Sequence, residues 1–177
     1  MTMEIVLSPD ERLRQECAPV ESIDDDIKRL AKQMAETMYA YDGCGIAAPQ
    51  VGVLKQLVVI DCQWGGDGPK KPIYLINPVI TEQSEEKMTW CEGCLSIPGV
   101  SFDIERSASV TVRALDLQGR LMQYEASGNL FCVCLQHEID HLHGRTMFER
   151  LTPAARLRGM REYQEALAAG ARPGETE

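Results

Sequence analysis

The segment Gln136-His137-Glu138-Ile139-Asp140-His141 carries metal-binding side chains at helical spacing. Histidines four residues apart project from one helix face, one turn apart, so both imidazoles can reach one ion. A glutamate beside the first histidine can take a proton from water at that ion. Histidines that only pack against or cap the helix are the alternative, but this pattern rarely arises by chance.

The flanking residues extend this segment into a longer helix. Ser127-Gly128-Asn129 provides an opening with a capping residue, and Gly144 provides a stop. His143 lies next to that stop, so we expect it to interact with the last carbonyls of the helix and not with a metal. One helix face carries the side chains at helical spacing, namely Leu130, Val133, Cys134, His137, Glu138 and His141.

The rest of the chain predicts an α+β fold. An N-terminal helix capped by Ser22 runs to Asp42-Gly43, and a C-terminal helix starts at Thr152-Pro153 and stops near Gly170. Between the helices, runs rich in branched residues predict strands, which are residues 56–61, 73–77, 110–117 and 120–124. We therefore expect mostly antiparallel strands packed around a central metal-binding helix, in one catalytic domain of residues 1–170 with a disordered tail at 171–177.

Composition narrows the function classes. The 177 residues include 27 acidic and 18 basic side chains, and the net charge of −9 argues against a protein that binds the phosphates of nucleic acid over a broad surface, although it leaves room for a local basic patch. We expect no sequence-specific binding of nucleic acid. Residues 1–9 lack the basic start of a secretory signal, and no apolar run is long enough to span a membrane. We expect a cytoplasmic protein with no membrane partner.

The cysteines fit a reducing compartment, since their number is odd and no export signal is visible. Cys94 is the strongest candidate for a third metal ligand, because neighbouring Gly93 lets the backbone approach a ligand closely. Glu149 or Glu162 remain alternatives by spacing alone. Cys91 and Cys94 also form a C-x-x-C pair, which is typical of redox pairs or of half a zinc site. The seven cysteines are residues 17, 44, 62, 91, 94, 132 and 134.

Two histidines, one thiolate and one open position describe a catalytic metal site, whereas a structural site normally closes with four protein ligands. The thiolate donates charge to the ion and lowers its Lewis acidity, so the identity of the metal affects the rate. It also makes the site sensitive to peroxide.

Three segments together resemble the motifs of peptide deformylases. The first is Gly43-Cys44-Gly45-Ile46-Ala47-Ala48-Pro49-Gln50, the second is Glu92-Gly93-Cys94-Leu95-Ser96, and the third is the Gln136–His141 segment. Their order, their intactness and the separation of Cys94 from His137 make the resemblance specific. It extends in weaker form from Ser8 to the C-terminal helix.

The resemblance implies a hydrolase that removes the N-formyl group from the initiator methionine of new polypeptides and releases formate. It implies one Fe2+ per chain, with Ni2+, Co2+ or Zn2+ as substitutes, held by Cys94, His137 and His141. Glu138 would move the proton from water to the leaving amine. The side-chain amide of Gln50 and the backbone N–H of Leu95 would stabilise the oxyanion.

The resemblance also implies an apolar pocket for the methionine side chain, although each member alone could be an ordinary core residue. Glu92 is expected to pair with Arg106 at the pocket wall, and Gly45 to let the peptide lie close to the backbone. Ser101 departs from some bacterial members, which have a peptide-binding arginine there. The pocket residues are Cys44, Trp90, Leu130, Val133 and Cys134.

Two other functions remain open at this stage, a small zinc endopeptidase and a binding protein that keeps a silent metal site. The presence of a catalytic base argues against the silent site. Action on formyl-methionyl nascent peptides further implies transient association with the ribosome. Arginines of the C-terminal region could contact ribosomal RNA or form an ordinary solvated face, namely Arg156, Arg158, Arg161 and Arg172.

Overall fold

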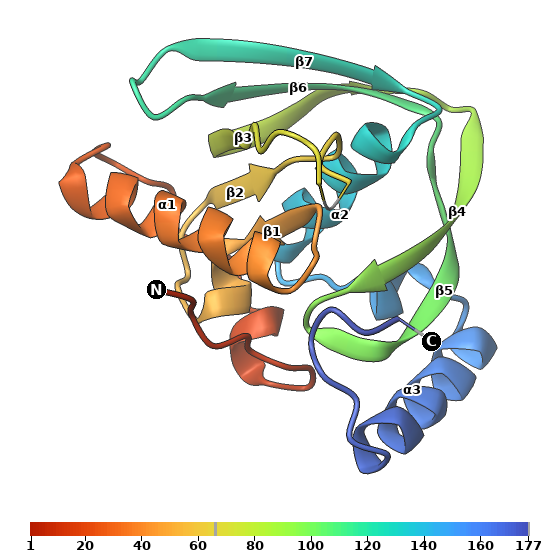
Figure 1. The fold of residues 1–177 in the computed structure, drawn as a ribbon. Helices are drawn as coiled ribbons and strands as arrows, with labels where there is room; N and C mark the ends of the chain where they lie inside the picture. The colour runs from red at the N-terminus through yellow and green to blue at the C-terminus, as the bar shows by residue number, and fades with distance from the viewer. Residues whose placement is uncertain (66, 177) are drawn as a thin grey trace.

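A computed structural model describes residues 1–65 and 67–176 of the chain. One α-helix precedes a run of antiparallel strands and two follow it (Figure 1), which confirms the predicted α+β class. The helices are α1 (Asp25–Ala40), α2 (Leu130–Leu142) and α3 (Pro153–Ala168), with short 3-10 helices η1 (Glu11–Arg14), η2 (Ala48–Val51) and η3 (Met147–Arg150). The strands are β1 (Gly45–Ala47), β2 (Leu57–Ile60), β3 (Ile73–Gln83), β4 (Lys87–Cys94), β5 (Ile97–Ser107), β6 (Ser109–Leu115) and β7 (Leu121–Ser127).

The strands of the described residues form two sheets. A five-stranded sheet has the order β1-β2-β3-β6-β7, and β4 pairs with β5 in a separate hairpin. All of these pairings are antiparallel. The predicted β6–β7 hairpin is confirmed, with Leu115 opposite Leu121 across the Gln118-Gly119 turn. Sequence patterns did not predict β4 and β5, although these strands form one wall of the site.

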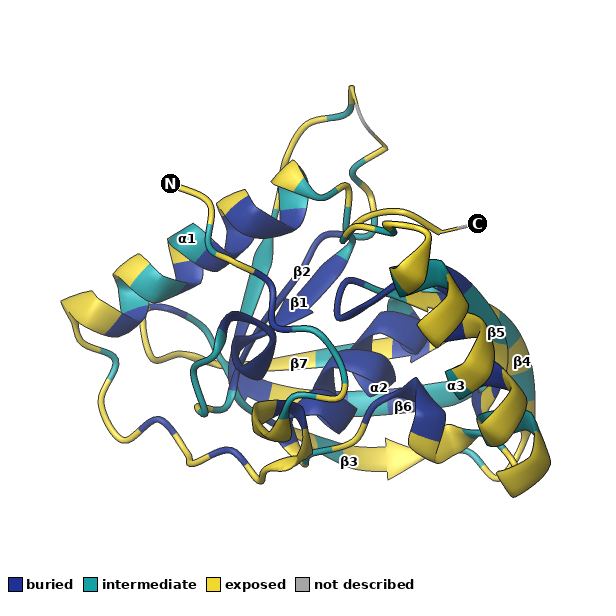
Figure 2. Ribbon diagram, turned by 90° about the horizontal axis from the view of Figure 1, so that it is seen from below, coloured by how far each residue is buried: buried dark blue, intermediate teal, exposed yellow. Residues whose placement is uncertain are grey.

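Helix α2 lies between the five-stranded sheet and the β4–β5 hairpin (Figure 1). It begins at Asn129, whose side chain accepts a hydrogen bond from the N–H of Cys132 at 2.9 Å, as a capping residue should. Every residue from Cys132 to Leu142 is buried, and Figure 2 shows the helix dark blue on most of its surface. A helix buried on all sides can carry polar groups only where partners or a ligand satisfy them.

The outer helices hold this arrangement from two sides. Helix α1 packs its buried face, which includes Met34 and Met38, against β1 and β2. Its cap is Asp24 and not Ser22, because the Asp24 carboxylate accepts from the N–H of Ile27 at 2.9 Å. Helix α3 is capped by Thr152 as predicted and packs against β5, with its outer side exposed (Figure 2). No helix in the described ranges combines the length and apolar character that crossing a bilayer requires.

Candidate metal centre

Helix α2 presents both histidines toward the β4–β5 hairpin. The His137 and His141 rings lie 5.0 Å apart between centroids, as expected for side chains one turn apart on one face. Burial is the main cause that lowers the pKa of His141, to about 3, so its imidazole is neutral and keeps a lone pair for a metal. The helix thus delivers two nitrogen donors to one buried point.

Cys94 completes the donor set from the end of β4. Its Sγ lies 3.4 Å from Nε2 of His141, and the donor atoms of Cys94, His137 and His141 all lie within 4.8 Å of one another. A tetrahedral ion with ordinary bond lengths separates a sulfur and a nitrogen donor by about 3.6 Å. These three side chains therefore fit a divalent transition metal in donor type and in spacing.

A chain of buried charges orients His137. The Glu92 carboxylate lies 2.8 Å from Nδ1 of His137 and accepts bonds from Nε and Nη2 of Arg106 at 2.6 and 2.9 Å. The pairing of Glu92 with Arg106 is therefore confirmed. Arg106 also donates to Asp140, which in turn accepts from Arg150. A carboxylate on the outer nitrogen of a ligand histidine fixes the tautomer and leaves the inner nitrogen free for the ion.

Electrostatics favours a cation at this point. Burial disfavours a charge on His137, yet the sulfur of Cys94 and the carboxylate of Glu92 raise its pKa above the usual value. A metal ion among the same groups would receive the same stabilisation and would replace the proton.

Glu138 lies beside the donor set and forms no ion pair within the described residues. Its Oε2 is buried and makes no hydrogen bond within the described residues. Burial is the main cause that raises its pKa to about 7, the range that suits a general base near neutral pH. Gly45 makes room for it, since a Cβ built on Gly45 would lie 2.6 Å from Oε1 of Glu138. The first motif therefore requires glycine there for a steric reason.

Gln50 reaches the same centre from η2. Its Oε1 accepts from the N–H of Ala47 at 2.8 Å, which turns the amide nitrogen toward Cys94 Sγ at 3.6 Å and Ser96 Oγ at 3.3 Å. A side chain held at both ends is a pre-oriented donor at the metal centre. Sequence analysis missed the part played by Ser96, which the second motif contains but which carries no distinguishing chemistry.

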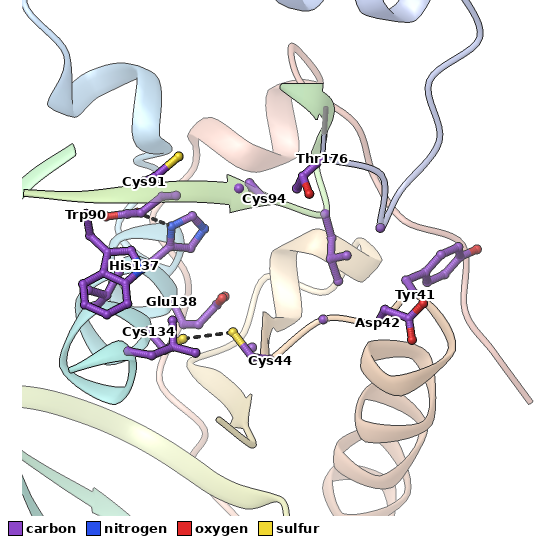
Figure 3. Close-up of a pocket in the computed structure, with 18 of the residues that line it drawn as sticks. Tyr41, Asp42, Cys44, Trp90, Cys91, Cys94, Cys134, His137, Glu138 and Thr176 are labelled. Atoms are coloured by element: carbon purple, nitrogen blue, oxygen red, sulfur yellow. Dashed lines mark hydrogen bonds and ion pairs between the residues drawn. The ribbon is translucent and has the colours of Figure 1, made fainter. Parts of the chain in front are cut away.

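A cavity of about 200 Å³ opens onto the metal centre (Figure 3). His137, Glu138, Cys94 and Leu95 form one side of it. The rest of its wall includes every predicted substrate-binding residue, namely Cys44, Gly45, Trp90, Glu92, Leu130, Val133 and Cys134. Apolar side chains beside a polar centre are the usual lining of a small-molecule site.

Comparison with known proteins identifies the family. A family model described as polypeptide deformylase matches residues 2–157. The chain belongs to the polypeptide deformylase family. It is 46% identical to a peptide deformylase of Alkalilimnicola ehrlichii over 168 residues, which cover 95% of this chain and 92% of that one. It is 44% identical to a peptide deformylase of Rhizobium meliloti, with 92% of each chain covered.

Solved deformylase structures agree with the fold. The crystal structure of a peptide deformylase from Legionella pneumophila has a TM-score of 0.87 and 38% identity, and covers 96% of this chain and 99% of that one. A Synechococcus elongatus peptide deformylase in complex with actinonin has a TM-score of 0.81 and 40% identity, and covers 94% and 85%. The chain is accordingly a metal-dependent hydrolase that removes N-formyl groups from nascent peptides.

The other candidate ligands are not part of the group formed by Cys94, His137 and His141. Cys91 is exposed, because residues three apart on a strand point to opposite faces, and Figure 3 shows its sulfur directed away from His137. His143 contacts Glu16, while its backbone N–H caps the helix by donating to the Asp140 carbonyl. Glu149 accepts from the N–H of Thr146 in η3. Glu162 is exposed on α3.

The C-terminal residues of the chain return to the cavity. We expected disorder for residues 171–177; the structure places residues 171–176, and residue 177 lies outside the described part. The carbonyl of Glu175 accepts from the N–H of Gly99 at 2.8 Å. Gly174, Glu175 and Thr176 line the mouth of the cavity.

Proposed function

We propose that this chain hydrolyses the formamide of N-formylmethionyl peptides with Fe2+ held by Cys94, His137 and His141. The observation that carries the proposal is the position of Glu138, a buried carboxylate without a hydrogen-bond partner for Oε2 within the described residues, beside three convergent metal donors. A bound Fe2+ supplies Lewis-acid polarisation of the formyl carbonyl and lowers the pKa of water.

The side chains divide the remaining work. Glu138 accepts a proton from the attacking water and delivers it to the departing amine, and a pKa of about 7 permits both transfers. The amide of Gln50 and the backbone N–H of Leu95 stabilise negative charge on the carbonyl oxygen. Glu92 keeps His137 in the orientation that binds the ion.

The methionine side chain is proposed to occupy the cavity, with Trp90, Leu130 and Val133 as apolar wall and Cys44 and Cys134 beside Glu138. Gly45 allows the peptide backbone to approach. Substrates of this kind emerge from the ribosome, so we propose cytoplasmic action on nascent chains with transient ribosome association, by one catalytic domain of residues 1–170.

The test is replacement of the proposed base. Glu138→Ala should retain the metal, because Glu138 is not a ligand, and should abolish release of formate from a formylmethionyl peptide. Metal content after anaerobic purification and a formate assay measure the two properties separately, and Glu162→Ala on exposed α3 is the matched control. Retained turnover in Glu138→Ala would exclude Glu138 as the base. Absence of formate release from the unaltered chain reconstituted with Fe2+ alone under anaerobic conditions would exclude the proposed ion.

A further inference from the structure

Three further cysteines converge beside the catalytic cavity. Cys44 immediately precedes β1, Cys62 follows the end of β2, and Cys134 lies on α2. Their Sγ atoms all lie within 4.8 Å of one another, and those of Cys44 and Cys134 are 3.1 Å apart. Figure 3 shows the latter two sulfurs facing each other next to Glu138.

The backbone fixes this convergence. Strands β1 and β2 pair with Gly45 opposite Ile60, and the N–H of Asp61 donates to the carbonyl of Cys44 at 2.8 Å. The pairing places Cys44 and Cys62 at adjacent strand ends, where α2 brings Cys134 against both. Three soft donors held by three separate elements form a preorganised group.

We propose that Cys44, Cys62 and Cys134 form a second metal site, which binds a thiophilic ion of the Cu(I) class. An ion about 2.3 Å from each sulfur holds the sulfurs roughly 3.8 to 4.0 Å apart. The Cys44–Cys134 separation of 3.1 Å is shorter than this value and no separation exceeds 4.8 Å, so small side-chain rotations suffice to seat an ion.

The number of donors favours Cu(I) over Zn2+. Structural zinc closes its shell with four protein ligands, whereas this group, among the residues that the structure describes, offers three sulfurs and no histidine or carboxylate. Thiolates select soft ions, and Cu(I) is satisfied by three sulfur ligands.

Access and charge also suit an ion here. Cys44 and Cys134 line the catalytic cavity, which gives the ion a path from solvent, and Cys62 is only half-buried. Hydrogen bonds from the thiols of Cys134 and Cys62 lower the pKa of Cys44, against the effect of burial. Cys44 is therefore the thiol of the three that we expect to lose its proton first when an ion binds.

A consequence for catalysis rests on the proposed function. An ion on these sulfurs would occupy the cavity wall beside Glu138, where the methionine side chain is proposed to bind. Copper would then inhibit the enzyme without displacing the catalytic metal. The binding itself does not depend on deformylase activity.

The experiment uses full-length protein whose catalytic site is loaded with Ni2+, kept under anaerobic conditions and titrated with Cu(I) against a chromogenic Cu(I) chelator. We expect one copper per chain with nickel fully retained, and X-ray absorption should report sulfur neighbours only. Cys62→Ser, which leaves the cavity lining intact, should weaken copper binding by more than about tenfold. Cys91→Ser and Cys17→Ser, at an exposed and a buried cysteine outside the group, should bind copper like the unaltered chain.

Several outcomes would overturn the site. Copper that replaces nickel one for one would place the ion at Cys94, and copper lost in Cys91→Ser but kept in Cys62→Ser would place it at the C-x-x-C pair. No stoichiometric copper would show that the three cysteines only pack. A mass loss of two hydrogens in place of bound copper would identify a disulfide. Absence of formate release from the nickel-loaded chain before any copper is added would refute the deformylase mechanism alone, and would leave the copper site standing.

Discussion

Replacing Glu138 by glutamine should stabilise the metal-free protein at alkaline pH while it abolishes hydrolysis. The folded-state pKa of Glu138 is raised from 4.5 to about 7, mainly by burial. For such a group, stability is fully present below the unfolded-state pKa and is lost as pH rises through the folded-state value. A difference of about 2.5 pKa units corresponds to a cost of about 3 kcal/mol once the carboxylate ionises. Glutamine has the same shape and never ionises, so it escapes this cost.

Urea unfolding of chelator-treated protein measures the effect. At pH 8, Glu138→Gln should unfold with a free energy higher by up to about 3 kcal/mol than the unaltered chain, and most of this difference should disappear at pH 5. The metal must be removed, because a nearby cation would itself stabilise the Glu138 carboxylate. Formate release by the metal-loaded variant, measured in parallel, should be absent.

Glu92→Gln is the matched control, since Glu92 is equally buried but paired with Arg106 and His137. Burial opposes ionisation of Glu92, yet these partners lower its pKa, so its contribution to stability is present above the unfolded-state pKa and lost in acid. Glu92→Gln should therefore destabilise the fold at pH 8. If both variants moved stability in the same direction at pH 8, the assignment of Glu138 as an unpaired buried carboxylate would be refuted.

Three further changes test other parts of the site. Gly45→Ala should lower kcat/KM by more than tenfold with the metal retained, because the new Cβ would displace Glu138. A formate assay on protein of known metal content measures this effect. Normal kinetics would contradict the steric argument. Glu92→Gln should also weaken metal affinity by about 10- to 100-fold in a chelator competition, since His137 loses its orienting partner. Removal of residues 171–177 should lower KM for a formylated peptide with kcat unchanged, because residues 174–176 line the cavity mouth; an unchanged KM would show that they do not obstruct binding.

The metal donors could be predicted from sequence because local geometry determines most of their arrangement. His137 and His141 lie one helix turn apart, so the helix alone brings them together. Asn129 is a typical capping residue and marks the start of that helix. Thr152 similarly marks the start of α3. Such capping signals depend on interactions within a few residues, so they can be recognised without knowledge of the tertiary structure.

The β4–β5 hairpin was not predicted because β5 contains residues that are unusual in strands. Pro98 and Gly99 lie inside β5, where both residues normally argue against a strand. The bond between Arg106 and Asp140 joins β5 to α2 across 34 positions, and no periodic pattern reports a contact at that distance. Non-local ion pairs of this kind require the tertiary structure.

The charges around α2 explain how a buried helix can carry a catalytic base. Glu92 and Asp140 both contact Arg106, and Asp140 also contacts Arg150, so these buried carboxylates are neutralised by cations. Separating the hairpin from α2 would leave buried charges of this network unpaired, at a large cost in free energy. The network therefore holds the β4–β5 hairpin against the helix. Glu138 lies next to this network and yet Oε2 has no partner within the described residues. The cations therefore keep Glu92 and Asp140 ionised but do not do so for Glu138. The pKa of Glu138 stays at about 7, so near neutral pH its carboxyl group can both accept and release a proton.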